Sequence, residues 1–253
     1  MPRGLSLALA ALLVLSGAAA VVWRRSSGLD EAAPLAPWPV ERIVRVELSR
    51  GGTRLILEKS AGRWKLQEPV RDWADDEAAD DLAQALHDLT LGAAVTSDPS
   101  SASAYGLSGL GQTRVTAFVE GRAAPVLDGA FGSAALGDAA LYFREERDSK
   151  VRLATGFPQE LLSRQAGDYR EKLLFPRSRG KLASLRLVEF VDPATAKDLD
   201  KPVLTLGPDG DPPSTWKIGA LKGKFRYARC DERGVTALVA DYDVAPLLSE
   251  KRK

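Results

Sequence analysis

The chain has 253 residues, of which 45% are hydrophobic and 27% are charged, so it is long enough to bury a core without disulfide bonds or metal ions. Its 35 lysines and arginines nearly balance its 34 aspartates and glutamates, which excludes the large basic surface that nucleic-acid binding usually needs. A single cysteine, Cys230, excludes an intrachain disulfide, and a single histidine, His87, excludes chemistry based on histidine clusters.

Residues 1–25 predict a transmembrane anchor. The run from Leu5 to Val22 carries no charge, and with Trp23 it is long enough to cross the hydrocarbon core of a bilayer. Arg3 precedes the run and two arginines follow it, so the charges at the two ends nearly balance. We therefore take the orientation from the usual topology of short N-terminal anchors. The expected protein spans the inner (cytoplasmic) membrane once and has a periplasmic, extracytoplasmic body.

A cleaved signal peptide is the alternative, with Ala18–Ala20 as a small-residue cleavage site. We favour the anchor because the apolar run continues beyond these alanines. Either interpretation exports residues 40–253. Residues 26–39 form a polar linker, whose prolines disfavour a helix and predict a short extended stalk.

From Val40 onward, apolar and polar residues alternate with the period of two that predicts β-strands. A helix is expected at 75–89, where apolar residues recur at helical spacing and acidic residues crowd the first turns. A loop is expected at 96–111. The expected strands are 44–49, 54–59, 64–67, 113–119, 140–144 and 150–153, and a short helix is expected at 157–165.

The opening of this pattern returns in the last third of the chain. The segment 185–190 resembles 44–48, and Trp216-Lys217-Ile218 resembles Trp64-Lys65-Leu66. The endings correspond as well. Segment 227–230 matches 141–144, segment 235–239 matches 151–153, and segment 246–249 matches 158–163.

This repetition predicts an α+β fold with an N-terminal transmembrane helix, then two related β-rich units of mostly antiparallel strands with a few short helices. The first unit, 40–178, contains the long helix, and the second, 179–253, is a shortened copy. Chance similarity between short alternating strands is the alternative.

Two motifs in the chain are distinctive. Tyr105-Gly106-Leu107 follows the predicted helix, and the segment DYREKLLF, Asp168 to Phe175, closes the first unit. With Trp64-Lys65-Leu66 and the strand at 113–119, they resemble the bacterial domain-of-unknown-function family DUF4340 over residues 43–175. The resemblance implies a membrane-tethered extracytoplasmic protein associated with ABC-type export systems, including those linked to gliding-motility auxiliary proteins. It implies no catalytic residues, and the insert Gly207–Ser214 departs from the family pattern.

No motif predicts a catalytic, cofactor-binding or metal-binding site. His87 lies away from the apolar stripe of its helix and is expected to be a solvated surface residue. The segment Gly106–Gly111 lacks the strand, helix and lysine that flank a phosphate-binding loop, so its glycines are expected to form turns. Nothing around Cys230 indicates an activated thiol.

An acidic cluster surrounds the start of the predicted helix. It lacks the spacing and the glycine of an EF-hand, so any calcium would be held loosely. We interpret the cluster as a solvated helix start that the helix dipole stabilises. Its members are Asp72, Asp75, Asp76, Glu77, Asp80 and Asp81.

The tryptophans divide into two kinds. Trp64 and Trp216 occupy equivalent positions in the repeat and are expected in the core, although each could also stack on a sugar. Trp38 and Trp73 lie outside the predicted strands and are candidates for a contact surface.

Three functional hypotheses follow. The first is a non-enzymatic accessory protein without cofactors, whose anchor places the β-rich body beside an ABC permease and its ATPase. The second is a stand-alone envelope module that holds a glycan, peptide or lipid in a groove between the repeats. The third is an enzyme that uses two carboxylates from different loops.

Overall fold

A computed structural model describes residues 33–35, 37–135, 139–196 and 199–250. The predicted anchor and most of the predicted linker lie outside these residues. Within the described part of the chain, no helix is long and apolar enough to span a bilayer.

The described residues form two compact units. Unit 1 comprises residues 33–54 and 82–163, and unit 2 comprises residues 55–81 and 164–250. Helix α2 (Asp76–His87) begins in unit 2 and ends in unit 1. The sequence predicted a boundary between two repeats at residues 178 and 179. The compact units are defined by contacts and not by repetition, so they do not test this boundary, which stays a prediction.

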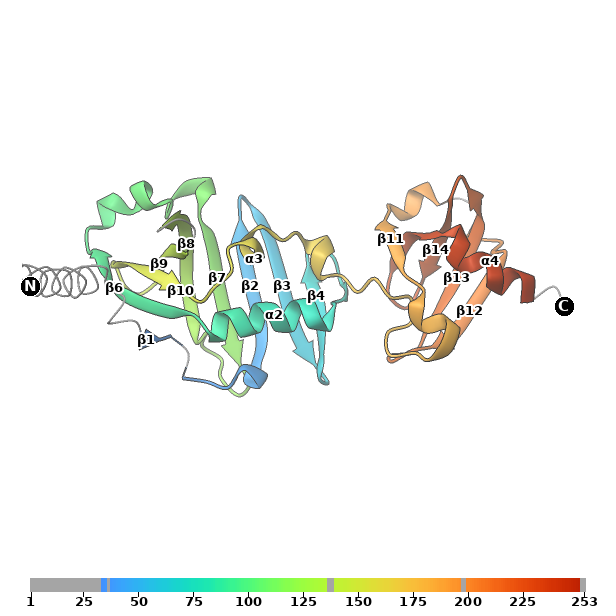
Figure 1. Cartoon of the computed structure of the whole chain (residues 1–253), viewed down its shortest axis with the longest axis horizontal. Helices are drawn as coiled ribbons and strands as arrows, with labels where there is room; N and C mark the ends of the chain where they lie inside the picture. Colours follow the sequence, from blue (N-terminus) through green and yellow to red (C-terminus); the bar gives the residue numbers. More distant parts are fainter. Residues whose placement is uncertain (1–32, 36, 136–138, 197–198, 251–253) are drawn as a thin grey trace, which may run out of the picture. The chain divides into compact units, whose positions relative to one another are not determined.

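Unit 1 is built on seven strands, in which every neighbouring pair is antiparallel. The labelled strands can be followed in Figure 1. Short helical segments lie at Val40–Arg42, Pro99–Tyr105, Gly109–Gly111 and α3 (Glu160–Ser163). The strand order is β1 (Ala33–Pro34), β6 (Thr90–Thr96), β10 (Val151–Thr155), β9 (Ala140–Glu145), β8 (Leu127–Ala135), β7 (Thr113–Val119) and β2 (Ile43–Arg50).

The end of the predicted linker belongs to unit 1. Ala33 and Pro34 pair with Leu91 and Thr90 of β6. Trp38 is only 8% exposed. The prediction that Trp38 contributes to a contact surface is therefore wrong, because its ring packs inside the unit instead.

The core of unit 1 includes inward-facing residues of β2 and β7 and a set of three phenylalanines. The Phe131 ring lies 4.9 Å from that of Phe143 and stacks on that of Phe157 at 4.7 Å. Strand β7 was predicted at its observed position, but β6 and β8 were not predicted. Both are rich in glycine and alanine, whose side chains give no contrast between apolar and polar faces.

Unit 2 contains two groups of strands. Strands β3 (Thr53–Ser60), β4 (Arg63–Glu68) and β5 (Asp72–Trp73) are antiparallel neighbours, with β3 entering the unit at Leu55. Short helical segments lie at Ala166–Tyr169, Gly180–Ser184 and Pro193–Thr195. A separate antiparallel sheet has the order β11 (Leu187–Phe190), β15 (Val235–Ala240), β14 (Phe225–Cys230), β13 (Ser214–Lys222) and β12 (Leu204–Asp209).

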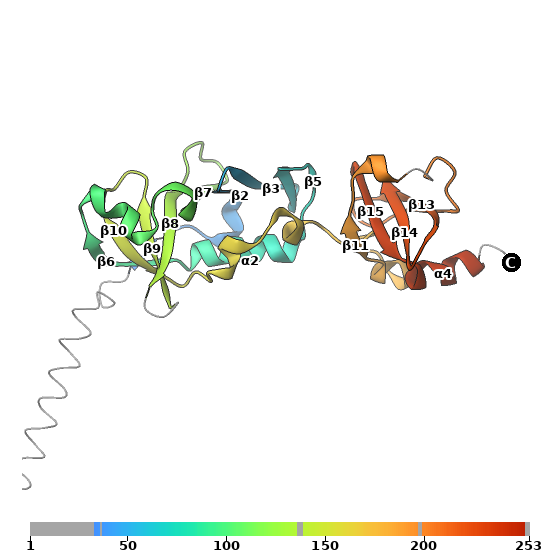
Figure 2. The same ribbon diagram turned by 90° about the horizontal axis from the view of Figure 1, so that it is seen from above.

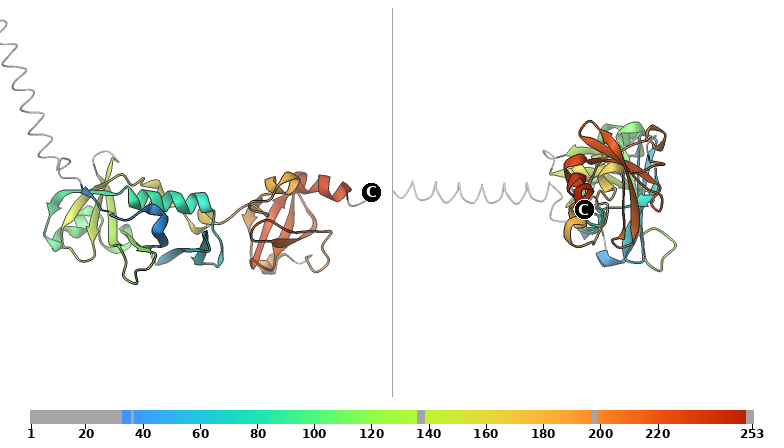
Figure 3. Two further views of the ribbon diagram at one scale, coloured as in Figure 1. Left: turned by 90° about the horizontal axis from the view of Figure 1, so that it is seen from below. Right: turned by 90° about the vertical axis from the view of Figure 1, so that its right-hand side faces the viewer.

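Helix α4 (Asp241–Glu250) follows β15 directly and lies beside the five-stranded sheet (Figure 2). Its Val244 is fully buried in the core of that sheet. Figure 3 shows the ribbon of this helix and sheet from below and end-on. The mostly antiparallel sheets with few helices confirm the predicted α+β class.

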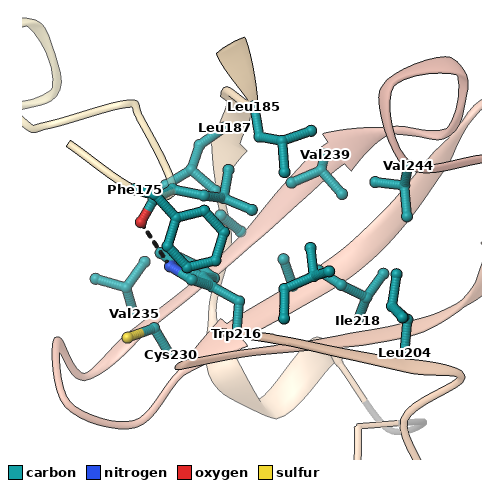
Figure 4. Close-up of a cluster of buried hydrophobic side chains, with 14 residues drawn as sticks. Phe175, Leu185, Leu187, Leu204, Trp216, Ile218, Cys230, Val235, Val239 and Val244 are labelled. Atoms are coloured by element: carbon teal, nitrogen blue, oxygen red, sulfur yellow. Dashed lines mark hydrogen bonds between the residues drawn. The ribbon is translucent and has the colours of Figure 1, made fainter. Parts of the chain in front are cut away.

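Both tryptophans predicted in the core are there. Trp216 is fully buried beside Phe175 (Figure 4), and its indole Nε1 donates a hydrogen bond to the carbonyl of Leu174 at 2.8 Å. Trp64 is 1% exposed, and its Nε1 donates to Asp80 Oδ1 at 2.7 Å. Each ring thus removes a large apolar surface from water while its single polar group keeps a partner.

The two tryptophan strands also occur in similar hairpins. In each hairpin, the apolar residue two positions after the tryptophan pairs with a leucine of the preceding strand, Leu66 with Leu57 and Ile218 with Leu204. The endings resemble each other as well, since the pairs β9–β10 and β14–β15 each lead into a helix. The openings differ, because β2 lies beside β7 whereas β11 lies at a sheet edge beside β15.

A close approach between backbones holds Tyr105-Gly106-Leu107 against β8. A Cβ atom at Gly132 would overlap the carbonyl oxygen of Tyr105, and Gly106 has a φ of +71°. By contrast, a Cβ atom at Gly111 would make only an ordinary contact, 3.6 Å from the carbonyl oxygen of Gly106. Glycine is therefore required at position 106 of the motif and at position 132 of β8, where the two backbones approach each other.

We predict that Gly132→Ala lowers the free energy of unfolding by about 1–3 kcal/mol, because the added methyl group must displace backbone rather than a flexible side chain. The matched control Gly111→Ala should change it by less than about 0.5 kcal/mol. Urea denaturation of the full-length protein in detergent, followed by circular dichroism, measures both. Equal effects of the two substitutions would contradict the close approach.

Candidate functional site

Four charged residues of unit 2 form a buried ionic group, the Asp72 cluster: Asp72, Arg170, Glu171 and Arg233. The side chains of Asp72 and Arg233 are both fully buried. Arg233 Nε donates to Asp72 Oδ1 at 2.9 Å, and its Nη2 donates to Oδ2 at 3.2 Å. Arg170 Nε donates the third hydrogen bond that Asp72 accepts, to Oδ2 at 2.9 Å.

The remaining donors of Arg233 are also occupied. Its Nη2 donates to the carbonyl of Glu171 at 2.8 Å, and its Nη1 donates to that of Leu173 at 3.2 Å. The guanidinium lies 4.9 Å from the ring of Trp73 and 5.4 Å from that of Trp216. A buried charge is tolerated only when it is paired and hydrogen-bonded in this way.

Glu171 lies at the edge of the cluster. Its Oε1 accepts the backbone N–H of Leu173 at 2.8 Å, and its Oε2 lies 3.8 Å from Arg63 Nη2. Burial raises the pKa of Glu171 above that of an ordinary glutamate. Arg63 also pairs with Asp76 at 3.2 Å, so the ionic contacts continue to the start of α2.

This arrangement is suited to holding unit 2 together. The Asp72 cluster joins β5, the DYREKLLF segment and the turn between β14 and β15. Arg170 and Glu171 come from that segment, and its Tyr169, Leu174 and Phe175 are fully buried. One of the two motifs that carry the resemblance to DUF4340 therefore contributes core and ion-pair residues.

The prediction that the acidic cluster is a solvated helix start is wrong for Asp72, which is 6% exposed. Asp80 accepts hydrogen bonds from Trp64 and from Lys59 Nζ at 3.1 Å. Asp75 caps the helix by accepting the N–H groups of Glu77 and Ala78. Within the described ranges, no three His, Cys, Asp or Glu residues are grouped so that they could hold a metal ion.

Two residues that were expected at the surface, His87 and Trp73, are half-buried, and Cys230 is fully buried. His87 is half-buried, and its Nδ1 has no hydrogen-bond partner within the described part of the chain. Cys230 is buried, and burial raises the pKa of its thiol to about 11, so it is protonated at neutral pH. Trp73, predicted outside strands, lies in β5 and is half-buried within 5.5 Å of the Arg63 guanidinium.

Unit 1 contains an open cleft with a volume of about 630 Å³. Sites for small ligands typically have about 300–1,000 Å³, so the cleft has the size of a binding site. Its residues come from the end of β2, the start of β7, β8, β9 and α3 with the loop before it. They are Arg50, Gly111, Thr113, Gly132, Ser133, Leu141, Phe157, Pro158, Gln159, Glu160, Leu162 and Ser163.

Five polar side chains of the cleft have few or no partners of their own. Arg50 Nη1 makes one long hydrogen bond, 3.4 Å, to the carbonyl of Leu162. Among the described residues, no carboxylate pairs with Arg50, and no side-chain hydrogen bond is made by Thr113, Ser133, Gln159 or Glu160. Arg50, Ser133, Gln159 and Glu160 are exposed and so available to a ligand, whereas Thr113 is buried in the wall of the cleft.

Local backbone geometry explains how the cleft forms. Arg50 and Thr113 pair directly across β2 and β7. Gly132 and Ser133 lie where the register of β8 against β9 shifts, and such irregularities are common beside functional sites. Tyr105-Gly106-Leu107 packs against this irregular part of β8. The second motif that carries the resemblance therefore supports one wall of the cleft.

A second, smaller pocket in unit 2 has about 200 Å³ and includes Lys65, Trp73 and Pro212. It is below the usual size of a ligand site, and its Arg63 already pairs with Asp76. The cleft of unit 1 is therefore the stronger candidate for a functional site.

The fold and the cleft define an α+β body with antiparallel sheets and an open, mostly polar site. Residues 64–213 match the family model described as domain of unknown function (DUF4340), which covers more than half of the chain. The chain belongs to this family, as the Tyr-Gly-Leu and DYREKLLF motifs predicted. No curated protein and no solved structure matches it.

We predict that Arg233→Met lowers the free energy of unfolding by about 3–5 kcal/mol, because it leaves Asp72 and two backbone carbonyls short of partners in a dry interior. Lys217→Met is the control, since its 2.6 Å pair with Asp231 is exposed and should contribute at most about 1 kcal/mol. Urea titration followed by tryptophan fluorescence measures both. Similar losses would show that the Asp72 cluster does not stabilise unit 2.

Proposed function

We propose that this chain is a non-enzymatic accessory protein of an ABC-type export system. It would be anchored in the inner membrane by residues 1–25 and would act outside the cytoplasm. The observation that carries the proposal is the uncharged run from Leu5 to Val22, followed by Trp23 and two arginines.

The distance between anchor and body supports a partner in the membrane. Only eight residue steps separate Arg25 from Ala33, where β1 begins. A fully extended chain covers at most roughly 30 Å in eight steps. Unit 1 would therefore stay close to the bilayer, and such tethering raises its effective concentration near a permease without any chemistry.

The state of the charged residues supports a role without catalysis. Asp72, Arg170 and Arg233 satisfy one another in unit 2, and Cys230 is protonated at neutral pH. An active carboxylate or thiol needs a free position for substrate, which these groups do not offer.

A stand-alone envelope module that binds a glycan, peptide or lipid is the second candidate, and the cleft favours it. The cleft has the volume of a ligand site, and its polar side chains have few partners. It is lined by residues of unit 1 alone, so such a module would not need the groove between repeats that the sequence suggested.

We predict that the full-length protein, purified from gently solubilised membranes, carries an ABC permease and its ATPase in constant ratio, as measured by mass spectrometry. The control replaces residues 1–25 with an unrelated single-pass anchor, which keeps the body at the membrane. Loss of the partners in this control would place the contact in the anchor, and their retention would place it in the body. Absence of both partners in several detergents would refute the accessory role.

The side of the membrane can be tested with one introduced thiol. Leu110 is 80% exposed, whereas the native Cys230 is buried. We predict that a membrane-impermeant maleimide labels Leu110→Cys in spheroplasts but leaves the unaltered protein unlabelled. Labelling of Leu110→Cys only after lysis would place the body in the cytoplasm.

A further inference from the structure

We propose that the cleft of unit 1 binds a short zwitterionic peptide, with the peptide carboxylate held at Arg50 and the ammonium group at Glu160. This inference rests on the second function proposed above and names its ligand class. It does not depend on the export partner.

The charges that line the cleft point to a ligand with both signs. Arg50 is the arginine of the cleft and Glu160 its carboxylate, and neither has an ion-pair partner in the part of the chain that is described. Arginine remains charged at any physiological pH and presents a planar set of donors that suits a carboxylate. An exposed glutamate is equally suited to an ammonium group.

The other lining groups fit a peptide backbone and an apolar side chain. The exposed hydroxyl of Ser133 and the exposed amide of Gln159 can donate and accept hydrogen bonds, as peptide N–H and C=O groups require. Leu141, Phe157 and Leu162 provide apolar contacts at the same site. Because the cleft is mostly polar, its hydrogen-bonding groups would contribute more to binding than these apolar contacts.

This contrasts with the Asp72 cluster, where every ion has a partner. There, Asp72 accepts three side-chain hydrogen bonds from two arginines. In the cleft, Ser163 donates a hydrogen bond to the carbonyl of Glu160, but the side chains of Arg50, Ser133, Gln159 and Glu160 make only one long hydrogen bond in the described part of the chain. Unpartnered polar groups on a concave surface are the ones that a ligand can satisfy.

The experiment uses calorimetric titration of the full-length protein in nonionic detergent with the dipeptide alanyl-phenylalanine. Two derivatives each lack one charge: the N-acetyl dipeptide has no ammonium group, and the C-terminal amide has no carboxylate. We expect the zwitterion to bind about five- to tenfold more tightly than either derivative, because each derivative loses one charged hydrogen bond.

Two substitutions assign the charges. Arg50→Gln should weaken binding of the zwitterion about fivefold and leave the affinity of the amide unchanged. Glu160→Gln should also weaken binding of the zwitterion about fivefold, but it should leave the affinity of the N-acetyl dipeptide unchanged. The matched controls Arg122→Gln and Glu120→Gln lie just beyond β7, at the end opposite Thr113, and should leave all affinities unchanged.

A fourth variant tests the location. Gly111 lines the cleft and has room for a Cβ atom, so Gly111→Leu should occupy part of the volume and weaken all three ligands while keeping the melting temperature. The proposal is overturned if no ligand binds, if the derivatives bind as tightly as the zwitterion, or if the control substitutions act like Arg50→Gln and Glu160→Gln. Partner co-purification is measured separately, so failure here does not affect the accessory role.

Discussion

The pairing of Asp72 with Arg233 is the interaction on which unit 2 depends most. It connects β5 to the turn after β14, two segments that are 161 residues apart in sequence. The DYREKLLF segment passes between them and contributes Arg170 and two backbone carbonyls. Because each of these groups would be costly to bury alone, they are stable only together. Trp216 packs against the same guanidinium and donates to Leu174, so the ionic group and the apolar core support each other.

The two family motifs have different structural roles. DYREKLLF provides buried rings and ions in unit 2. Tyr105-Gly106-Leu107 brings its backbone against β8, where only glycine fits at position 132. Both motifs therefore act on the packing of their own units: one through buried rings and ion pairs, the other through a close approach of two backbones.

Sequence patterns predicted part of the fold well. Strand β7, the Trp64 and Trp216 strands and the helix α2 were predicted because apolar residues recur there at clear strand or helix spacing. Strands β6 and β8 were missed because alanine and glycine carry little periodic signal. The cleft was missed as well. Arg50, Thr113 and Glu160 are far apart in sequence, and each is an ordinary polar residue at the end of an element.

The sequence by itself determined the α+β class, the family, the core tryptophans and the prediction of an anchor, because these depend on local periodicity, composition and short motifs. Only the tertiary structure decided which charges are satisfied. Asp72 and Asp76 are four positions apart in one acidic run, yet Asp72 is buried against two arginines whereas Asp76 pairs with Arg63 at the start of α2. Arg50 and Arg233 likewise cannot be told apart from the sequence. Arg233 is buried in an ion pair whose hydrogen bonds are all made, whereas Arg50 lies in an open cleft. The partners of a charge are set by long-range strand pairing rather than by neighbours in sequence.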